Sequence, residues 1–451
     1  MSLHDRVVGA DTLKRIRQQR GWSLRDLSRA LAATAQRLGQ PPSASPASVQ
    51  RSVARWESTT APILPGERYQ LLLAHLYSRG ADGDVALGSG SDFAELLDAL
   101  AQLGESQQRL RELRILLTRT MADDGGGLLG LLGPTTRAAL AASLADPSRV
   151  SEDLIDSLHC AVHDVNEQVG TVPFVRLQLF LAPIVESCRR LLGEDASPPD
   201  VFLPGLNSVA AQAYVLAARC AFETRDDGAS RAFYAAATTA AGAVGAPWRR
   251  AMVHMSHALV TLYSAPGLAP AQRLVDAAVR DAKAGESVTV RARAHALQAE
   301  LAARAGGARH AHAALSLARY DLDRCRNDDP SSSMTGFSAA HLRGSEGVTA
   351  LYTGDPSEAH AYFARSAASL STSRERVQRA IVLTDQAAAR IRMGDPQGAA
   401  ALLHDCVDTA VSTGGRVAFL RLRQARRDLR PWRREDFAAR LDDHMIDALG
   451  V

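Results

Sequence analysis

The sequence is poor in aromatic residues and in long hydrophobic runs, and both shortages restrict the fold. Aromatic residues make up only 5% of the 451 residues, whereas alanine is abundant. Because alanine is the best helix former and few aromatic or β-branched runs favour strands, the composition predicts an all-α protein. No apolar run reaches the roughly 18 residues that a membrane-spanning helix needs, so we expect no membrane span.

Cysteine is also scarce. The five cysteines form no C-x-x-C pair, and their odd number does not suit a disulfide framework. We therefore expect small buried thiols in a reducing compartment. The N-terminal residues MSLHDRVVGADTLKR contain no apolar segment of the signal-peptide kind. Together these features predict a cytoplasmic protein.

The sequence lacks the common motifs of enzymes. It contains no G-x-x-x-x-G-K-[ST], H-E-x-x-H or G-x-S-x-G, and no G-x-G-x-x-G after a strand. His159, His163 and Glu167 share one helical face and could meet a metal ion, but a polar helix face has the same spacing. We expect neither catalysis nor a metal ion or other cofactor.

Lysine is nearly absent, since Lys14 and Lys283 are the only two, and the positive charge comes from arginine. In such a protein the arginine count alone does not indicate phosphate binding. The distribution of charge is more informative. Residues 1–80 carry a net charge of +7, and the remaining residues carry −4. A basic head on a mildly acidic body is expected where only the head meets a polyanion.

The head has the pattern of a small helical domain. We expect helices over residues 12–20, 47–57 and 66–78. Between the first two, after Gly21 ends the first, a second helix starts at Ser23 and carries Leu24, Leu27 and Leu31 at helical spacing. The segment 39–46 contains three prolines and cannot be helical throughout. In the third helix, Val49, Val53 and Trp56 repeat at the spacing of one buried face.

Two segments, RQQRGWSLRDL (17–27) and SVARWE (52–57), resemble the Xre-type helix-turn-helix family of repressors. The resemblance implies that the helix at 47–57 reads DNA. The sequence departs from the family twice. An insertion around 38–45 replaces the tight turn between the two helices, and Ser58-Thr59-Thr60 stands where the family has a glycine. The first departure affects the placement of the reading helix, and the second affects its exit turn.

The residues opposite the buried face of this helix are the expected DNA contacts. Glutamine pairs with adenine and arginine with guanine in the major groove, which admits one helix. Basic residues near the preceding helices are candidates for phosphate contacts. The alternative is that these are solvated side chains in an arginine-rich protein. The candidates are Gln50, Arg51, Ser52, Ala54 and Arg55 for the groove, and Lys14, Arg15, Arg17 and Arg25 for phosphates.

After a Gly-, Asp- and Ser-rich linker at 79–92, residues 93–121 show one long helical pattern with leucines at alternating spacings of four and three. Two interpretations fit. The helix is either a short dimerising coiled coil or an amphipathic helix that packs on the body. We expect a homodimer, and domains over 1–80 (helix-turn-helix), 81–127 (linker and dimerisation helix) and 128–451 (sensor).

The last domain contains an internal repeat. LYTGDPSEAHAYFARSA (351–367) aligns with IRMGDPQGAAALLHDCV (391–407), 40 residues later, and weaker copies begin near 222, 263 and 301. The segment 320–340 resembles an inserted loop. This period predicts stacked helical hairpins with a concave binding surface. Residues 205–415 resemble tetratricopeptide-like arrays, which implies that this domain binds a peptide, a small molecule or a partner protein.

The segment 416–434 holds eight arginines and one acid. It could touch DNA beside the head, hold carboxylates of a partner, or form a polar helix that closes the array. Taken together, the sequence predicts a DNA-binding regulator with a helix-turn-helix head and a ligand-binding helical array. The alternative is an interaction scaffold whose head is a degenerate helix-turn-helix.

Overall fold

The regular structure of the described residues consists of helices. The computed structural model describes residues 3–37, 45–79, 85–88, 90–121, 128–325, 328–332 and 336–449. In these ranges, β pairing is limited to two isolated bridges, Arg79–Val85 and Val169–Val172. The predicted all-α fold is confirmed. The chain divides into two compact units, Met1–Asp146 and Pro147–Val451.

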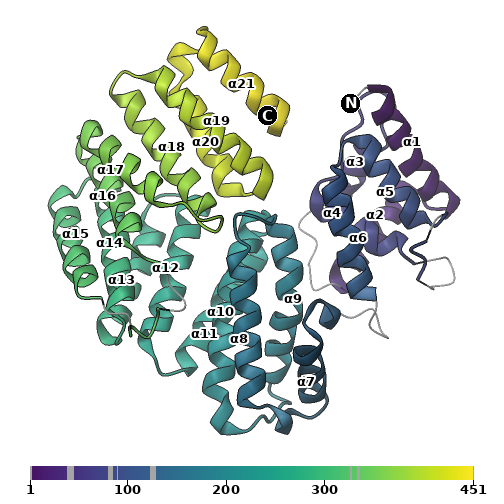
Figure 1. The fold of residues 1–451 in the computed structure, drawn as a ribbon, viewed down its shortest axis with the longest axis horizontal. Helices are drawn as coiled ribbons and strands as arrows, with labels where there is room; N and C mark the ends of the chain where they lie inside the picture. Colours follow the sequence, from purple (N-terminus) through teal and green to yellow (C-terminus); the bar gives the residue numbers. More distant parts are fainter. Residues whose placement is uncertain are drawn as a thin grey trace. The chain divides into compact units, whose positions relative to one another are not determined.

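The first unit runs from purple to blue in Figure 1 and contains the head together with the residues predicted as a linker. Its core is lined by Ile16, Leu31, Val53 and Leu72, each at most 2% exposed. The helices are α1 (Leu3–Gln19), α2 (Leu24–Arg37), α3 (Pro46–Trp56), α4 (Glu67–Tyr77), α5 (Asp92–Leu103), α6 (Gln107–Met121) and α7 (Pro134–Ala145).

The predicted long helix over 93–121 is wrong. Gly104 adopts a left-handed φ of +116° and separates α5 from α6. The leucines of the predicted seam are buried inside the first unit, so they do not form an exposed dimerisation stripe: Leu96, Leu100, Leu103, Leu110 and Leu117. A Cβ atom at Gly9 of α1 would lie 2.7 Å from the carbonyl oxygen of Ala99, which shows how closely α5 packs on α1. Residues beyond 80 thus complete the head.

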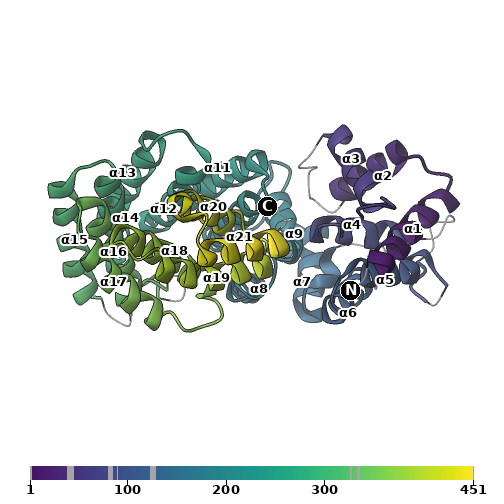
Figure 2. The same ribbon diagram turned by 90° about the horizontal axis from the view of Figure 1, so that it is seen from above.

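The second unit is an array of helical hairpins (Figures 1 and 2). Consecutive helices pair from α10 to α19, as the repeat predicts. The helices are α8 (Glu152–Glu167), α9 (Phe174–Leu191), α10 (Leu203–Glu223), α11 (Asp227–Ala243), α12 (Pro247–Ser264), α13 (Ala269–Ala284), α14 (Val288–Arg304), α15 (Ala308–Asp323), α16 (Ala339–Thr353), α17 (Pro356–Ser369), α18 (Arg376–Arg392), α19 (Pro396–Thr413), α20 (Arg416–Asp428) and α21 (Asp436–Leu449).

The repeated G-D-P turn is the connection within the last two hairpins. Gly354 and Gly394 have positive φ values of 103° and 81°, where glycine is favoured over other residues. The carboxylate of Asp355 accepts a hydrogen bond from the backbone of Glu358, and Asp395 caps α19 in the same way. The turn therefore ends one helix and starts the next.

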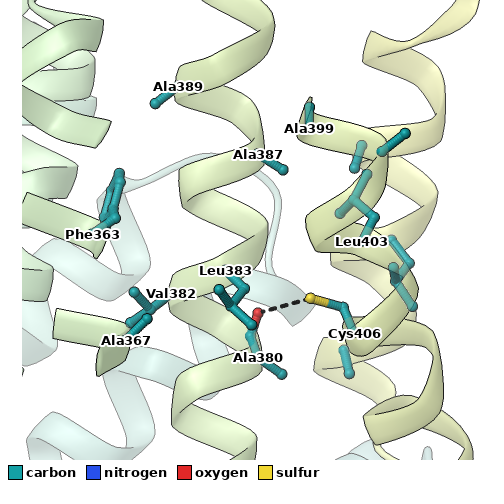
Figure 3. Packing of buried hydrophobic residues seen from close by; sticks show 14 of the residues in the cluster. Phe363, Ala367, Ala380, Val382, Leu383, Ala387, Ala389, Ala399, Leu403 and Cys406 are labelled. Carbon is teal, nitrogen blue, oxygen red and sulfur yellow. Dashed lines mark hydrogen bonds between the residues drawn. The ribbon is translucent and has the colours of Figure 1, made fainter. Parts of the chain in front are cut away.

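Small residues let the paired helices approach closely. Figure 3 shows Ala380, Leu383 and Ala387 of α18 facing Leu403 and Cys406 of α19, with Phe363 of α17 on the other side. A Cβ atom at Gly347 would lie only 2.6 Å from the nearest ring carbon of Phe363, so glycine is needed at this position. Each hairpin buries its apolar face only by stacking on its neighbours.

The predicted loop at 320–340 begins at the end of α15 and is anchored where the structure describes it. The carboxylate of Asp329 accepts hydrogen bonds from the hydroxyls of Ser287 and Ser331 and from the backbone of Thr289. These hydrogen bonds lower the pKa of Asp329 to about 2, although desolvation of its carboxylate opposes the shift. The insertion therefore covers the start of α14.

One helix of the array is long and apolar enough to span a membrane. It is the stretch Asp200–Glu223, and 56% of its most apolar window is buried inside the structure. Such burial is what a core helix of a soluble protein shows. Of the five cysteines, all are free; Cys188, Cys220 and Cys406 are buried as predicted, whereas Cys160 and Cys325 are exposed.

Helix α20 joins distant parts of the array. Arg421 donates to Tyr263 of α12 (2.7 Å) and to Asp385 of α18 (2.7 Å). The backbone of Val417 donates to Glu223 of α10, and Arg416 pairs with Asp227 of α11. The predicted concave surface is thus bridged by the arginine-rich segment. Burial opposes the charge of Arg421, but Asp385 and Tyr263 raise its pKa.

We expect Arg421→Met to lower the free energy of unfolding by about 2 kcal/mol, because Asp385 loses its counter-ion while only 17% of its side chain is exposed. Urea unfolding followed by circular dichroism measures the loss. Asp385→Asn in the same background removes the unpaired charge and should recover part of it. A fully additive loss in the double variant would contradict this assignment.

Candidate nucleic-acid interface

The turn between α1 and α2 forms as the sequence predicts. Gly21 has a φ of +69°, which ends α1. The Ser23 hydroxyl oxygen accepts from the backbone of Asp26 (3.2 Å), and the Asp26 carboxylate accepts from the backbone of Ser23 (3.0 Å). This reciprocal capping box sets the start of α2. The Ser23 hydroxyl also donates to the Asp26 carboxylate (2.6 Å), and this hydrogen bond, together with the one from the Ser23 backbone, lowers the pKa of Asp26.

Helix α3 begins at a defined cap. The Ser45 hydroxyl accepts from the backbone of Ser48 (3.3 Å), and Pro46 occupies the first helical position. The rest of the predicted insertion, residues 38–44, lies outside the described residues. The helix is held by Val49, Val53 and Trp56, which are at most 7% exposed.

The opposite side of α3 faces solvent. Arg51, Ala54 and Arg55 are exposed, while Gln50 and Ser52 are half-buried. The single polar contact recorded among these side chains is a long one, from Arg55 to the Ser52 hydroxyl (3.5 Å). Two exposed guanidinium groups and one half-buried amide therefore lie on this side of α3 without a carboxylate partner among the described residues. This face carries positive charge and hydrogen-bond donors, and it is one helix wide.

The phosphate candidates behave differently from one another. Lys14 and Arg25 are exposed and have no ion pair among the described side chains. Arg15 is also exposed but pairs with Glu95 of α5 at 3.2 Å. Lys14 and Arg25 thus keep their charge available to an anion.

The prediction that Arg17 contacts DNA is wrong, because Arg17 is buried. Its guanidinium donates two hydrogen bonds to the Glu57 carboxylate (2.8 and 2.7 Å) and one to the carbonyl oxygen of Trp22 (2.6 Å). The two side chains are only 9% and 6% exposed. The Glu57 hydrogen bonds raise the pKa of Arg17, against the effect of burial. Arg17 lies on the buried face of α1 beside Leu13 and Ile16, so its guanidinium binds Glu57 inside the head and is not available to DNA.

Sequence reasoning missed the role of Glu57 and of Arg20. Glu57 follows Trp56 and ties the end of α3 to α1 through Arg17. Arg20 lies over the rings of Trp22 and Tyr77, 5.2 and 5.0 Å from their centroids, and pairs with Asp92 (2.6 Å). Apart from Trp22, which is two residues from Arg20, these partners lie 40 to 72 residues from their arginine. The R-G-W and W-E motifs contain Arg20 and Glu57, but the motifs do not indicate which distant residues these two side chains contact.

The exit turn after α3 is made without the family's glycine. The Ser58 hydroxyl oxygen accepts from the backbone N–H groups of Thr60 (3.3 Å) and Ala61 (3.2 Å). A serine that bonds its own backbone closes a turn without a positive φ. Ser58 therefore ends α3 with a turn at the place where the Xre-type pattern has a glycine.

The core of the first unit contains His75 of α4, which is 5% exposed and whose Nε2 has no hydrogen-bond partner among the described residues. Burial, together with the charges of Arg37 and Arg79, lowers its pKa from 6.5 to about 4. The unfolded chain takes up this proton first as the pH falls. The contribution of neutral His75 to stability is complete above pH 6.5 and is lost as the pH falls towards 4.

Lowering the pH from 7 to 5 should therefore reduce the free energy of unfolding of the first unit by about 2 kcal/mol through His75. Urea unfolding at both pH values, followed by Trp22 and Trp56 fluorescence, measures it. The variant His75→Leu serves as the reference and should lose less on the same change. An equal pH dependence in both proteins would contradict the assignment.

A metal site does not form where the sequence offered one. No cluster of three metal-ligating side chains occurs among the described residues. The His159 ring lies 3.4 Å from the Gln212 amide oxygen.

Comparison with known protein families, with curated proteins and with solved structures finds no match for this chain.

Proposed function

We propose that the chain is a sequence-specific DNA-binding transcription regulator whose first unit reads the major groove with α3. The observation that carries the proposal is the outward face of α3, where Gln50, Arg51 and Arg55 project from a helix held rigid by its buried side. Glutamine pairs bidentately with adenine, and arginine with guanine. Ala54 leaves space for a close approach to a base edge or a thymine methyl group.

The phosphate contacts support the same orientation. Lys14 and Arg25 lie on the two helices that precede α3, and their charges are not neutralised within the head. Contacts of this kind fix the position of a protein on the duplex without reading its sequence. The buried Arg17–Glu57 pair has a different role, because it holds the end of α3 against α1.

A single α3 offers a small interface, so we propose that two copies bind as a homodimer to half-sites about one helical turn apart. The α5–α6 leucines are buried in the head and do not supply the dimer surface. In this account the protein acts in the cytoplasm, and its array binds the effector that changes operator affinity. If a saturating concentration of effector left operator affinity unchanged, the proposed coupling between the array and the head would be wrong.

Capture of genomic fragments tests the proposal. Purified protein is incubated with fragmented DNA of its own genome, and the bound fragments are sequenced. The wild type should enrich one two-fold-related site. Enrichment should disappear in Gln50→Ala/Arg51→Ala/Arg55→Ala. If the wild type enriches nothing with or without candidate effectors, the alternative of an interaction scaffold with a degenerate head is supported instead.

A further inference from the structure

The C-terminal end of the array contains a cavity of about 640 Å³. It lies between α20, the short turn Arg430–Trp432 and α21. Its apolar lining consists of Leu429, Ala438 and Leu441, which are 3%, 6% and 1% exposed. The remaining lining residues are five arginines and one acid: Arg423, Arg426, Arg427, Arg430, Arg433 and Asp442. We call this the arginine cavity.

Most of the positive charge in the arginine cavity is not neutralised. Asp442 pairs with Arg426 at 2.6 Å. Arg427 donates to the Gln424 amide oxygen, and Arg423 lies 5.8 Å from the Phe419 ring centroid. The guanidinium groups of Arg430 and Arg433 have no hydrogen-bond or ion-pair partner among the described residues, although the two residues bond to each other through their backbones. Four of the five guanidinium groups therefore lack a carboxylate, and the lining carries a net charge of +4.

The spacing of these arginines brings them together at a cost. Arg423, Arg426, Arg427 and Arg430 follow each other at intervals of three, one and three residues, which places them on one side of the helix and its continuation. Like charges four residues apart, as in Arg423–Arg427 and Arg426–Arg430, destabilise a helix. The core side needs only Leu422, Ala425 and Leu429. A helix that merely closed the array would have no use for four unneutralised charges around a cavity.

We propose that the arginine cavity binds a small phosphorylated molecule of the nucleoside polyphosphate class. Its volume falls within the range of about 300–1,000 Å³ that small-molecule sites occupy. Guanidinium groups bind phosphate oxygens through paired, charge-assisted hydrogen bonds. The methylene stems of the arginines and the buried floor of Leu429, Ala438 and Leu441 offer apolar contact to the nucleoside, and the guanidinium groups suit the phosphates. The bases of a DNA duplex are stacked inside it and cannot enter such a concave lining, so a free molecule fits it better.

The binding step is independent of DNA recognition, but the assignment of this ligand as the effector rests on the proposed function. Helix α20 carries the cavity and also bridges α12 and α18 through Arg421. A ligand held on α20 therefore acts on the element that joins distant hairpins. Ligand binding to the native state stabilises it according to the ratio of ligand concentration to Kd.

Calorimetric titration of the full chain with ATP, ADP, AMP and adenosine in EDTA at fixed salt tests the proposal. Affinity should rise with phosphate number, and ATP should bind more tightly than inorganic tripolyphosphate. The variant Arg427→Gln/Arg430→Gln/Arg433→Gln should weaken ATP binding at least about 100-fold, because it removes three charge-assisted contacts. The matched control is Arg273→Gln/Arg280→Gln/Arg309→Gln, which removes three exposed arginines elsewhere in the array and should stay within about twofold of wild type.

Four results would overturn the inference. They are the absence of ATP binding to the wild-type chain, an equal weakening in both triple variants, equal affinity for tripolyphosphate and ATP, and a cavity variant that loses DNA affinity but keeps ATP affinity. The Gln50→Ala/Arg51→Ala/Arg55→Ala chain separates this inference from the proposed function. That variant should bind ATP as the wild type does while failing to bind DNA, so each failure can be recognised by itself.

Discussion

Gln50→Ala/Arg51→Ala/Arg55→Ala should reduce affinity for the operator at least about 1,000-fold at fixed salt, because each good base contact is worth about 1–3 kcal/mol. The thermal unfolding midpoint should change little. The two arginines are exposed, Gln50 is half-buried, and alanine is the better helix former. Titration of a labelled operator fragment measures the loss, and circular dichroism confirms that the head remains folded.

A matched control comes from α6. Gln108→Ala/Arg111→Ala/Arg114→Ala likewise removes one glutamine and two arginines, here from exposed helical positions of the same unit. It changes the net charge equally but leaves α3 intact, so operator affinity should fall no more than about threefold. Similar losses in both triple variants would show that binding depends on overall charge.

Lys14→Ala and Arg25→Ala should weaken binding to all DNA sequences alike. Each should reduce the slope of log affinity against log salt concentration by about one unit.

Arg17→Ala should destabilise the first unit by about 3–5 kcal/mol, because it leaves the buried Glu57 carboxylate without its counter-ion. The carbonyl oxygen of Trp22 loses a donor at the same time. Urea unfolding followed by tryptophan fluorescence in a Trp248→Phe/Trp432→Phe background measures the change, since the remaining Trp22 and Trp56 lie in this unit. Operator binding should fail in proportion to the unfolded fraction, with no loss of specificity in the folded protein.

Two comparisons separate this buried pair from an ordinary surface pair. Arg15→Ala removes an ion pair whose side chains are 50% and 30% exposed, and should cost less than about 1 kcal/mol. Arg17→Met/Glu57→Leu replaces both charges with apolar groups and should recover most of the stability lost in Arg17→Ala. If Arg17→Ala were as mild as Arg15→Ala, the pair would not hold the head together.

Local chemistry made much of the fold predictable. The Gly21 turn, the Ser23–Asp26 capping box and the inward spacing of Val49, Val53 and Trp56 depend on residues close in sequence, and the structure contains all three. The 40-residue repeat could be predicted for the same reason, because Gly354-Asp355 and Gly394-Asp395 form the same turn and cap the next helix in successive hairpins. In each case the responsible contact spans only a few residues.

What escaped prediction depends on contacts between distant residues. Arg17 has the spacing of a core position and the chemistry of a phosphate contact, and only the position of Glu57, 40 residues later, decides between them. The break within 93–121 is an exception, because left-handed Gly104 ends α5 and the Ser106 hydroxyl accepts from the backbone of Arg109, and the regular leucine spacing hid these local signals. Arg421 meets Tyr263 across 158 residues, so no local pattern indicated that α20 bridges the array.

Protection of guanine N7 from dimethyl sulfate tests most directly whether α3 lies in the major groove. The reagent methylates that atom on the major-groove edge, where an arginine fork binds guanine. We predict two-fold-related protected guanines on the operator with the wild-type protein. With Arg51→Ala or Arg55→Ala, at protein concentrations that restore occupancy, one guanine in each half-site should become reactive again. Protection that is unchanged by the loss of either arginine, or absent at full occupancy, would contradict the account.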